Sequence, residues 1–149
     1  MAAFIQIREG LFSDRRVGAL ACPPTRQSMG VAQALTPVGV LVSPGTSGSN
    51  VVVPADAAAV ALLLGAVVYN PAEELDASDQ YAIGDVLPVL EEGEIYLTAD
   101  TACTKGAAAF VVHTTGHVRN DVTGATQSAR VIFDETLAAP GVVRCKIRA

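Results

Sequence analysis

Alternating apolar and polar positions recur in short runs along this chain, and glycine or proline separates the runs. The clearest block covers residues 81–97. Its apolar stretch from Val86 to Leu90 is interrupted by Glu91-Glu92-Gly93 and resumes at Ile95. Glycine-containing turns of a few residues between β-rich runs are typical of hairpins. The pattern therefore predicts a strand, a tight turn at 91–93 and a second strand.

Other strands are expected where β-branched residues gather between turn residues. Residues 55–61 differ, because Pro54 and Asp56 suit the start of a short helix. Residues 13–37 are polar and rich in turn residues, and we predict no long element there. The further predicted strands cover residues 38–42, 51–53, 62–69, 107–113, 129–133 and 142–148.

Many short strands separated by Gly and Pro turns indicate a sandwich or a barrel. We expect an all-β fold, either a jelly-roll-like sandwich or a partly closed barrel, with at most one short helix. The 149 residues suit one domain, and neither a repeat nor a linker divides them. We therefore predict a single β-rich domain over residues 1–149. Residues 1–12 are amphipathic and form either a first strand or an extended arm.

Charge and cysteine content narrow the classes of partner. The formal net charge is -5 and the ten basic residues are scattered, whereas binding to nucleic acid needs clustered Lys and Arg. Three cysteines cannot form a fully paired disulfide framework, which favours a reduced, intracellular protein. The apolar runs at 17–21 and 57–68 are too short for a signal peptide and a membrane span respectively. We expect no nucleic acid, membrane or cofactor.

Three residues are candidates for chemistry. His113 and His117 are four residues apart and could share a helix face, but Thr114-Thr115-Gly116 is a poor helix former. Two ligands without a third make no catalytic zinc site, so we predict no metal. Cys103 could pair with either histidine in space as a nucleophile. No helix N-terminus is recognisable around Cys103, and a small buried thiol is the simpler interpretation.

The glycine-rich segment 45–49 (Gly-Thr-Ser-Gly-Ser) resembles a phosphate-binding loop only in composition. It lacks the Gly-Lys-Ser/Thr ending, so no lysine reaches a phosphate. We therefore interpret it as a flexible connection between strands.

The spacing of glycine and apolar residues over residues 60–149 resembles the structural cement (decoration) proteins of tailed-bacteriophage capsids. Four segments carry the resemblance. They are Leu62 to Asn70, Tyr81-x-x-Gly84-Asp85-x-x-x-Val89-Leu90-x-x-Gly93-x-Ile95-Tyr96-Leu97, Thr104-Lys105-Gly106-Ala107 to Val111, and the pair Ala129 to Phe133 with Pro140 to Arg144.

This resemblance implies a non-enzymatic structural protein that binds the outside of an icosahedral capsid and stabilises the expanded shell by bridging major capsid subunits. It would be made in the host bacterial cytoplasm and end on the outer surface of the virion. It would also associate with other copies of itself, with a trimer favoured over a dimer. The N-terminal arm is a plausible clamp, since an extended apolar segment can add as a strand to a partner's edge. The expected contact residues are Phe4, Ile5, Ile7, Leu11 and Phe12.

A second class of function stays open from the residues alone. It is a small β-barrel ligand-binding domain or enzyme that uses His113, His117 or Cys103. The two classes differ in whether those side chains meet in a polar pocket.

Overall fold

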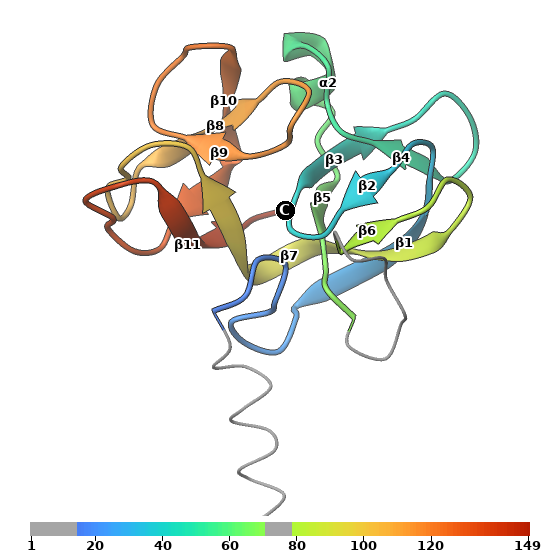
Figure 1. Ribbon diagram of the computed structural model, residues 1–149, viewed down its shortest axis with the longest axis horizontal. Coiled ribbons are helices and arrows are strands. Elements are labelled where there is room, and N and C mark those ends of the chain that lie inside the picture. Colours follow the sequence, from blue (N-terminus) through green and yellow to red (C-terminus); the bar gives the residue numbers. More distant parts are fainter. Residues whose placement is uncertain (1–14, 71–78) are drawn as a thin grey trace, which may run out of the picture.

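The computed structural model describes residues 15–70 and 79–149. The strands of these residues close into two rings that share one long strand (Figure 1). The elements are β1 (Arg26–Ala32), β2 (Thr36–Pro37), β3 (Leu41–Pro44), β4 (Asn50–Val52), α2 (Ala57–Ala61), β5 (Gly65–Val67), β6 (Gln80–Tyr81), β7 (Val86–Ala99), β8 (Ala108–Val112), β9 (Val118–Arg119), β10 (Ala125–Phe133) and β11 (Gly141–Ile147).

We call the ring β1-β4-β3-β5-β7 barrel 1. Its pairs are antiparallel except for β1–β4, which is parallel and joins only Val31 to Asn50 and Ala32 to Val51. The small sheet of β2 and β6 belongs to the same half of the molecule, on the right of Figure 1.

The ring β7-β11-β10-β8-β9 is barrel 2, on the left of Figure 1. Its longest ladder joins β11 to β7 over seven residue pairs, from Gly141↔Ala99 to Ile147↔Gly93. A parallel contact between Ala99 and Val118 closes the ring. The all-β prediction is confirmed, and within the described residues α2 is the only helix.

The predicted turn at 91–93 is wrong, because β7 continues through it from Val86 to Ala99. Gly93 has a φ of +149°, a value that side chains disfavour, and the strand changes partners at this point. Before Gly93 the partners are β1 and β5; from Gly93 onward they are β11 and then β9. The polar pair Glu91-Glu92 therefore marks the crossing between two barrels and not a reversal of the chain.

Two hydrophobic clusters correspond to the two barrels. The smaller contains Val40, Val42 and Val67 and lies inside barrel 1. Leu41 and Ala66, which alternate with them, join the larger cluster that fills barrel 2. Strands β3 and β5 are thus buried on both faces, so their sequences read as continuous apolar runs instead of alternating ones.

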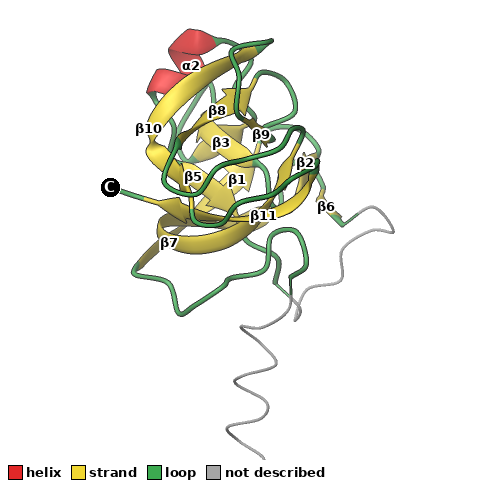
Figure 2. Cartoon of the chain, turned by 90° about the vertical axis from the view of Figure 1, so that its left-hand side faces the viewer, coloured by secondary structure: helices red, strands yellow, loops and turns green. Residues whose placement is uncertain are grey.

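Helix α2 confirms the prediction for residues 55–61. The Asp56 side chain accepts a hydrogen bond of 2.8 Å from the Ala59 N–H and caps the helix. The predicted strand over residues 62–69 is shorter than expected, because Leu62 caps α2 and only Gly65–Val67 pair. Figure 2 shows α2 beside the end of β10. No helix in the described part of the chain is long and apolar enough to span a membrane.

Strand β1 was not predicted, because it lies in the polar stretch 13–37. Its first four residues are exposed, yet they pair with β7. A strand of this kind is formed by its backbone partner, not by an apolar face, so periodicity gives no signal for it.

Arg130 ties the two barrels together where β10 bends. Its guanidinium donates to the carbonyls of Leu63, Leu64 (3.2 Å) and Glu91 (3.2 Å), and its Nε donates to the carbonyl of Arg148 (2.9 Å). One side chain therefore satisfies carbonyls from the α2–β5 connection, from the shared strand and from the C-terminal segment.

Candidate functional site

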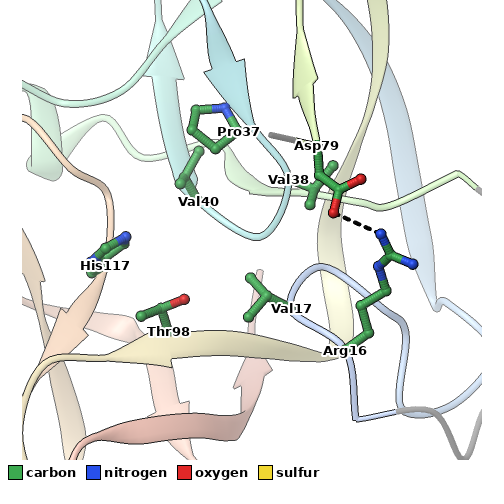
Figure 3. Close-up of a pocket in the computed structure, with 8 residues that line it drawn as sticks. All are labelled: Arg16, Val17, Pro37, Val38, Val40, Asp79, Thr98 and His117. Atoms are coloured by element: carbon green, nitrogen blue, oxygen red, sulfur yellow. Dashed lines mark hydrogen bonds and ion pairs between the residues drawn. The ribbon is translucent and has the colours of Figure 1, made fainter. Parts of the chain in front are cut away.

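A groove lies where the two barrels meet (Figure 3). It encloses about 370 Å³, and Arg16, Val17, Pro37, Val38, Val40, Asp79, Thr98 and His117 line it. A second groove of about 530 Å³ adjoins it, since Pro37 and His117 line both. The second groove is mainly apolar and continues along Leu35, Val52 and Val53.

The turn before β9 places His117 in these grooves. Thr114 donates its N–H to the Pro54 carbonyl, and Gly116 accepts a hydrogen bond of 3.0 Å from the Leu41 N–H. Gly116 has a φ of +72°, and a Cβ there would lie 2.8 Å from the Leu41 carbonyl oxygen. The turn of barrel 2 that contains Gly116 therefore packs directly against the backbone of barrel 1. This close contact and the positive φ together require glycine at position 116.

The polar side chains around the grooves pair with one another. His117 Nδ1 lies 3.0 Å from Asp100, and Arg16 lies 2.6 Å from Asp79. All four side chains are about a third exposed or more, so these pairs contribute little to stability. Among the lining residues Arg16 and Asp79 carry opposite charges and pair with each other, and much of the remaining wall is apolar.

The structure does not bring the three chemical candidates into one hydrogen-bonded group. His113 Nε2 lies 2.8 Å from the Thr126 hydroxyl, and His117 contacts Asp100. The Cys103 thiol is buried and donates to the Thr101 carbonyl at 3.3 Å. Burial raises the pKa of Cys103 to about 11, so the thiol stays protonated at neutral pH. Among residues 15–70 and 79–149, no three metal-ligating side chains cluster.

The predicted contact residues Phe4, Ile5, Ile7, Leu11 and Phe12 lie outside the described residues. Two further residues separate Phe12 from the start of the described chain, a segment that we call the strap, residues 15–21. Along this strap, Gly18 and Ala21 donate to the carbonyls of Tyr96 (2.8 Å) and Glu94 (3.0 Å) on β7.

Two adjacent arginines fasten the strap to opposite barrels. Arg15 pairs with Glu135 at 2.5 Å and lies over the Tyr96 ring at 5.0 Å, on the barrel 2 side. The Arg15 side-chain hydrogen bond lowers the pKa of Glu135. Arg16 lies 3.9 Å over the Tyr69 ring and pairs with Asp79. Sequence reasoning missed this strap, and the only available signal was an Arg-Arg pair before a glycine.

Exposed apolar side chains gather on barrel 1, which sequence reasoning also missed. Six large apolar side chains among the described residues are exposed, and four of them belong to β1, to the start of β7 or to the bends beside these strands. These four are Met29, Leu35, Ile83 and Val86. For three of them a signal was available, since Met29 and Ile83 each precede a glycine and Val86 follows Asp85.

Taken together, these observations define a β-barrel protein whose described part has exposed apolar side chains and keeps Cys103, His113 and His117 in separate hydrogen bonds. The family described as "Structural cement protein (E217 gp24/Pam3 gp6)" matches residues 17–148. The chain therefore belongs to this family of phage structural proteins. The resemblance noted in the sequence is confirmed.

A solved structure shows the same fold. A chain from "The capsid of Myoviridae Phage XM1" superposes with a TM-score of 0.72 at 20% identity, covering 89% of each chain. A chain from "The crystal structure of head fiber gp8.5 N base in bacteriophage phi29" gives a TM-score of 0.45 at 11% identity, covering 82% of this chain and 92% of that one, and carries no argument. None of the curated proteins compared with the chain matches it.

Proposed function

We propose that this protein binds the outer surface of an icosahedral bacteriophage capsid and stabilises the expanded shell by bridging major capsid subunits. The observation that carries the proposal is membership of the structural cement family over residues 17–148. In this proposal the protein is made in the host bacterial cytoplasm, associates with other copies of itself and acts on the virion surface.

Binding, and not catalysis, is the mode of action that we propose. The Cys103 thiol is protonated and each histidine bonds to a separate partner, so the described residues offer no nucleophile with an adjacent base. Two replacements test this point. Cys103→Ala and His113→Ala are expected to leave shell binding unchanged, and loss of function in either folded variant would favour the ligand-binding or enzymatic alternative.

The strap supports a role for the N-terminal residues as a clamp. Residues 1–14 are covalently continuous with Arg15, and residues 15–21 bond to the shared strand and to both barrels. Force applied to an arm held by a neighbouring subunit would therefore reach both barrels together. We propose that Phe4, Ile5, Ile7, Leu11 and Phe12 make the contact with the shell.

The charge distribution is compatible with an acidic contact surface. The described residues carry nine Lys and Arg against ten Asp and Glu, whereas the whole chain has a net charge of -5. Of the remaining excess negative charge, three charges belong to residues 71–78 and one to residues 1–14. An acidic surface would suit a positively charged shell exterior, and its contribution would fall as salt is added.

Co-sedimentation with purified shells tests the proposal. The protein is mixed with expanded empty capsids of its phage, and unexpanded procapsids are the control. Saturable binding to expanded capsids alone, at a fixed ratio to the major capsid protein, is the expected result. Absence of binding to both shells would overturn it.

A paired variant tests the arm. Ile5→Asp with Ile7→Asp is expected to weaken shell binding strongly, because two charges would enter an apolar contact. Val122→Asp is the matched control, since Val122 is exposed on barrel 2. Equal binding by both variants would show that the arm is not the clamp.

A further inference from the structure

Strand β1 has an open edge. Its inner edge pairs with β7 from Arg26 to Val31, but on its outer edge the ladder with β4 starts only at Val31. Residues 26–29 are all exposed. Strand edges of this kind are usually blunted by Lys, Pro or a covering segment. Residues 26–30 contain neither Lys nor Pro, so their side chains do not prevent another strand from pairing here.

The direction of the backbone groups at this edge follows from their neighbours. The Pro88 carbonyl accepts from Val68, beside β5, so the backbone of Pro88 points away from β1. Met29 lies opposite Pro88, and its N–H and C=O therefore point away from β7. Val31, two residues on, confirms this direction, because its N–H donates to Ser49 on the outer side.

Gln27 shares the direction of Met29, since backbone direction alternates along a strand. The outer edge thus presents one N–H and one C=O at each of these two residues. The described residues supply no ladder partner on this side of Gln27 or Met29. Ser28, between them, turns its backbone groups inward to β7, where it lies opposite Val89.

The side chains beside this edge are uncharged or already paired. Residues 27–30 carry no charge, and Arg26 lies 3.5 Å from the Glu91 carboxylate. Met29 is 57% exposed and Val86, on the same face, is 52% exposed. The edge therefore fits an extended chain that offers backbone N–H and C=O groups and places an apolar side chain against Met29 and Val86.

A protein that bridges two capsid subunits needs two separate contact surfaces. The proposed N-terminal clamp leaves the described chain at Arg15, over the Tyr96 ring on the barrel 2 side. The open edge belongs to barrel 1, where Gln27 lies opposite Leu90. Six residues of β7 separate Leu90 from Tyr96, roughly 20 Å along an extended strand. The edge is thus distinct from the clamp and can meet a second subunit.

We propose that the outer edge of β1 binds an extended segment of a major capsid subunit as an additional strand. This inference rests on the proposed function, because it names a surface through which the shell would be held. The added strand accepts from the N–H groups of Gln27 and Met29 and donates to their carbonyls, which makes four hydrogen bonds. It occupies the position beside β1 that β4 leaves empty before Val31.

The pairing is short, and this sets its role. Val31 is already bonded on its outer side and the Thr25 N–H to Glu92, so pairing is limited to residues 26–30. A contact of this size is smaller than stable interfaces bury. The edge therefore holds a capsid subunit only together with a second contact elsewhere on the protein.

Amide hydrogen exchange of the full chain, free and bound to expanded capsids, tests the proposal. In the free protein the N–H groups of Gln27 and Met29 should exchange fast, whereas that of Ser28 is directed to β7 and should exchange slowly. On the shell, exchange at Gln27 and Met29 is expected to slow at least about tenfold.

Val122 is the control for exchange. Its side chain is exposed on barrel 2, and its N–H has no backbone partner among the described residues. Exchange at Val122 should stay fast in the free and in the bound protein, so a general slowing of exchange on the shell can be recognised.

Three outcomes would overturn the proposal. Capsid binding that leaves Gln27 and Met29 in fast exchange would exclude the β1 contact and leave the proposed function intact. Slow exchange at both residues in the free protein would show that another segment or another copy already covers the edge. A protein that binds neither expanded capsids nor procapsids would overturn the proposed function together with this inference.

A proline at position 29 tests the hydrogen bonds separately from the side chain. Met29→Pro removes an N–H that points away from β7, so the ladder with β7 should survive, since proline is tolerated at strand edges. Its dissociation constant for expanded capsids is expected to rise at least about fivefold, the effect of one lost hydrogen bond. Met29→Leu is the matched control, because it keeps the N–H and an apolar side chain, and it should bind like the unchanged protein. Equal binding by the two folded variants would contradict the added strand.

Discussion

The two barrels share a strand, and each is closed by a short parallel contact, but they differ in their ladders and in the size of their cores. Barrel 2 is held by the seven-pair ladder of β11 and β7, and it contains the buried aromatic ring of Phe133. The longest ladder of barrel 1 joins β1 to β7 over six residue pairs and is interrupted between Arg26 and Gln27, and its smaller core consists mainly of valine around the buried ring of Tyr81. Four of the six exposed large apolar side chains also belong to the barrel 1 half.

This difference suggests a division of roles within one chain. The larger hydrophobic cluster gives barrel 2 the greater share of stability. Barrel 1 keeps open backbone groups and exposed apolar side chains, which are the features of a contact surface. The following changes test that comparison, beginning with the largest expected effect.

Truncating a buried core side chain is expected to lower the free energy of unfolding more than any other change. Phe133→Ala should lower the free energy of unfolding by about 3–5 kcal/mol, and Leu87→Ala in barrel 1 by about 2–5 kcal/mol, since both side chains are almost fully buried. Urea unfolding followed by far-UV circular dichroism measures both. If β7 makes the barrels one cooperative unit, each variant shifts a single transition. Two separate transitions would contradict the single domain that the sequence predicts.

A pair of glycines isolates the contact between the barrels. Gly116 and Gly124 both have positive φ, +72° and +61°, but only Gly116 touches the other barrel. Both Gly→Ala changes incur about 1–2 kcal/mol for the left-handed backbone. Gly116→Ala should lose a further 1–3 kcal/mol or so, because its Cβ would overlap Leu41. Equal urea midpoints for Gly116→Ala and Gly124→Ala would show that the contact between the two barrels is loosely packed.

Removing the guanidinium of Arg130 tests the tie at the crossing. Arg130→Lys should lower stability by about 2 kcal/mol, because an ammonium group cannot reach the several carbonyls that Arg130 satisfies. Arg148→Lys is the control, since Arg148 is exposed at the end of the chain and meets Arg130 through its backbone carbonyl. Thermal unfolding of both variants gives the comparison.

Acidification should give the smallest change in the free energy of unfolding. The folded protein holds the pKa of Glu135 below its usual value of 4.5, with the Arg15 hydrogen bond as the largest cause. The corresponding stability is therefore present above about pH 4.5 and is lost as the pH falls through the lower folded pKa. The pair is partly exposed, so only a few tenths of a kcal/mol are expected. Glu135→Gln should make stability less dependent on pH in this range. If the variant shows the same dependence as the unchanged protein, the contact between Arg15 and Glu135 is not its cause.

Local patterning was sufficient for strands with at least one apolar face and for the capped helix. Residues 142–148 alternate, and β11 was found there; Asp56 identified the start of α2. The pattern could not distinguish a turn from a crossing at Glu91-Glu92-Gly93, because both need a glycine beside polar residues. The partners on either side of Gly93 are distant in sequence, and only the folded structure reveals them.

The candidate site was less accessible to sequence reasoning. The family resemblance indicated the class of protein. Cys103 was correctly interpreted as a small buried thiol. The open edge of β1 was missed, because unpaired backbone groups have no side-chain signature. The strap was missed for a related reason, since its contacts with Tyr96 and Glu94 are made by the backbone.

The shared strand has a consequence for dividing the protein. A cut at Gly93 would leave each fragment with half of β7, and each ring would lose a wall together with its hydrogen-bonding partners. Neither half is therefore expected to fold when produced alone. Insertions and new chain ends belong instead in the exposed loop at Gly48, where a side chain meets nothing within 4 Å and the two flanking strands still pair with each other.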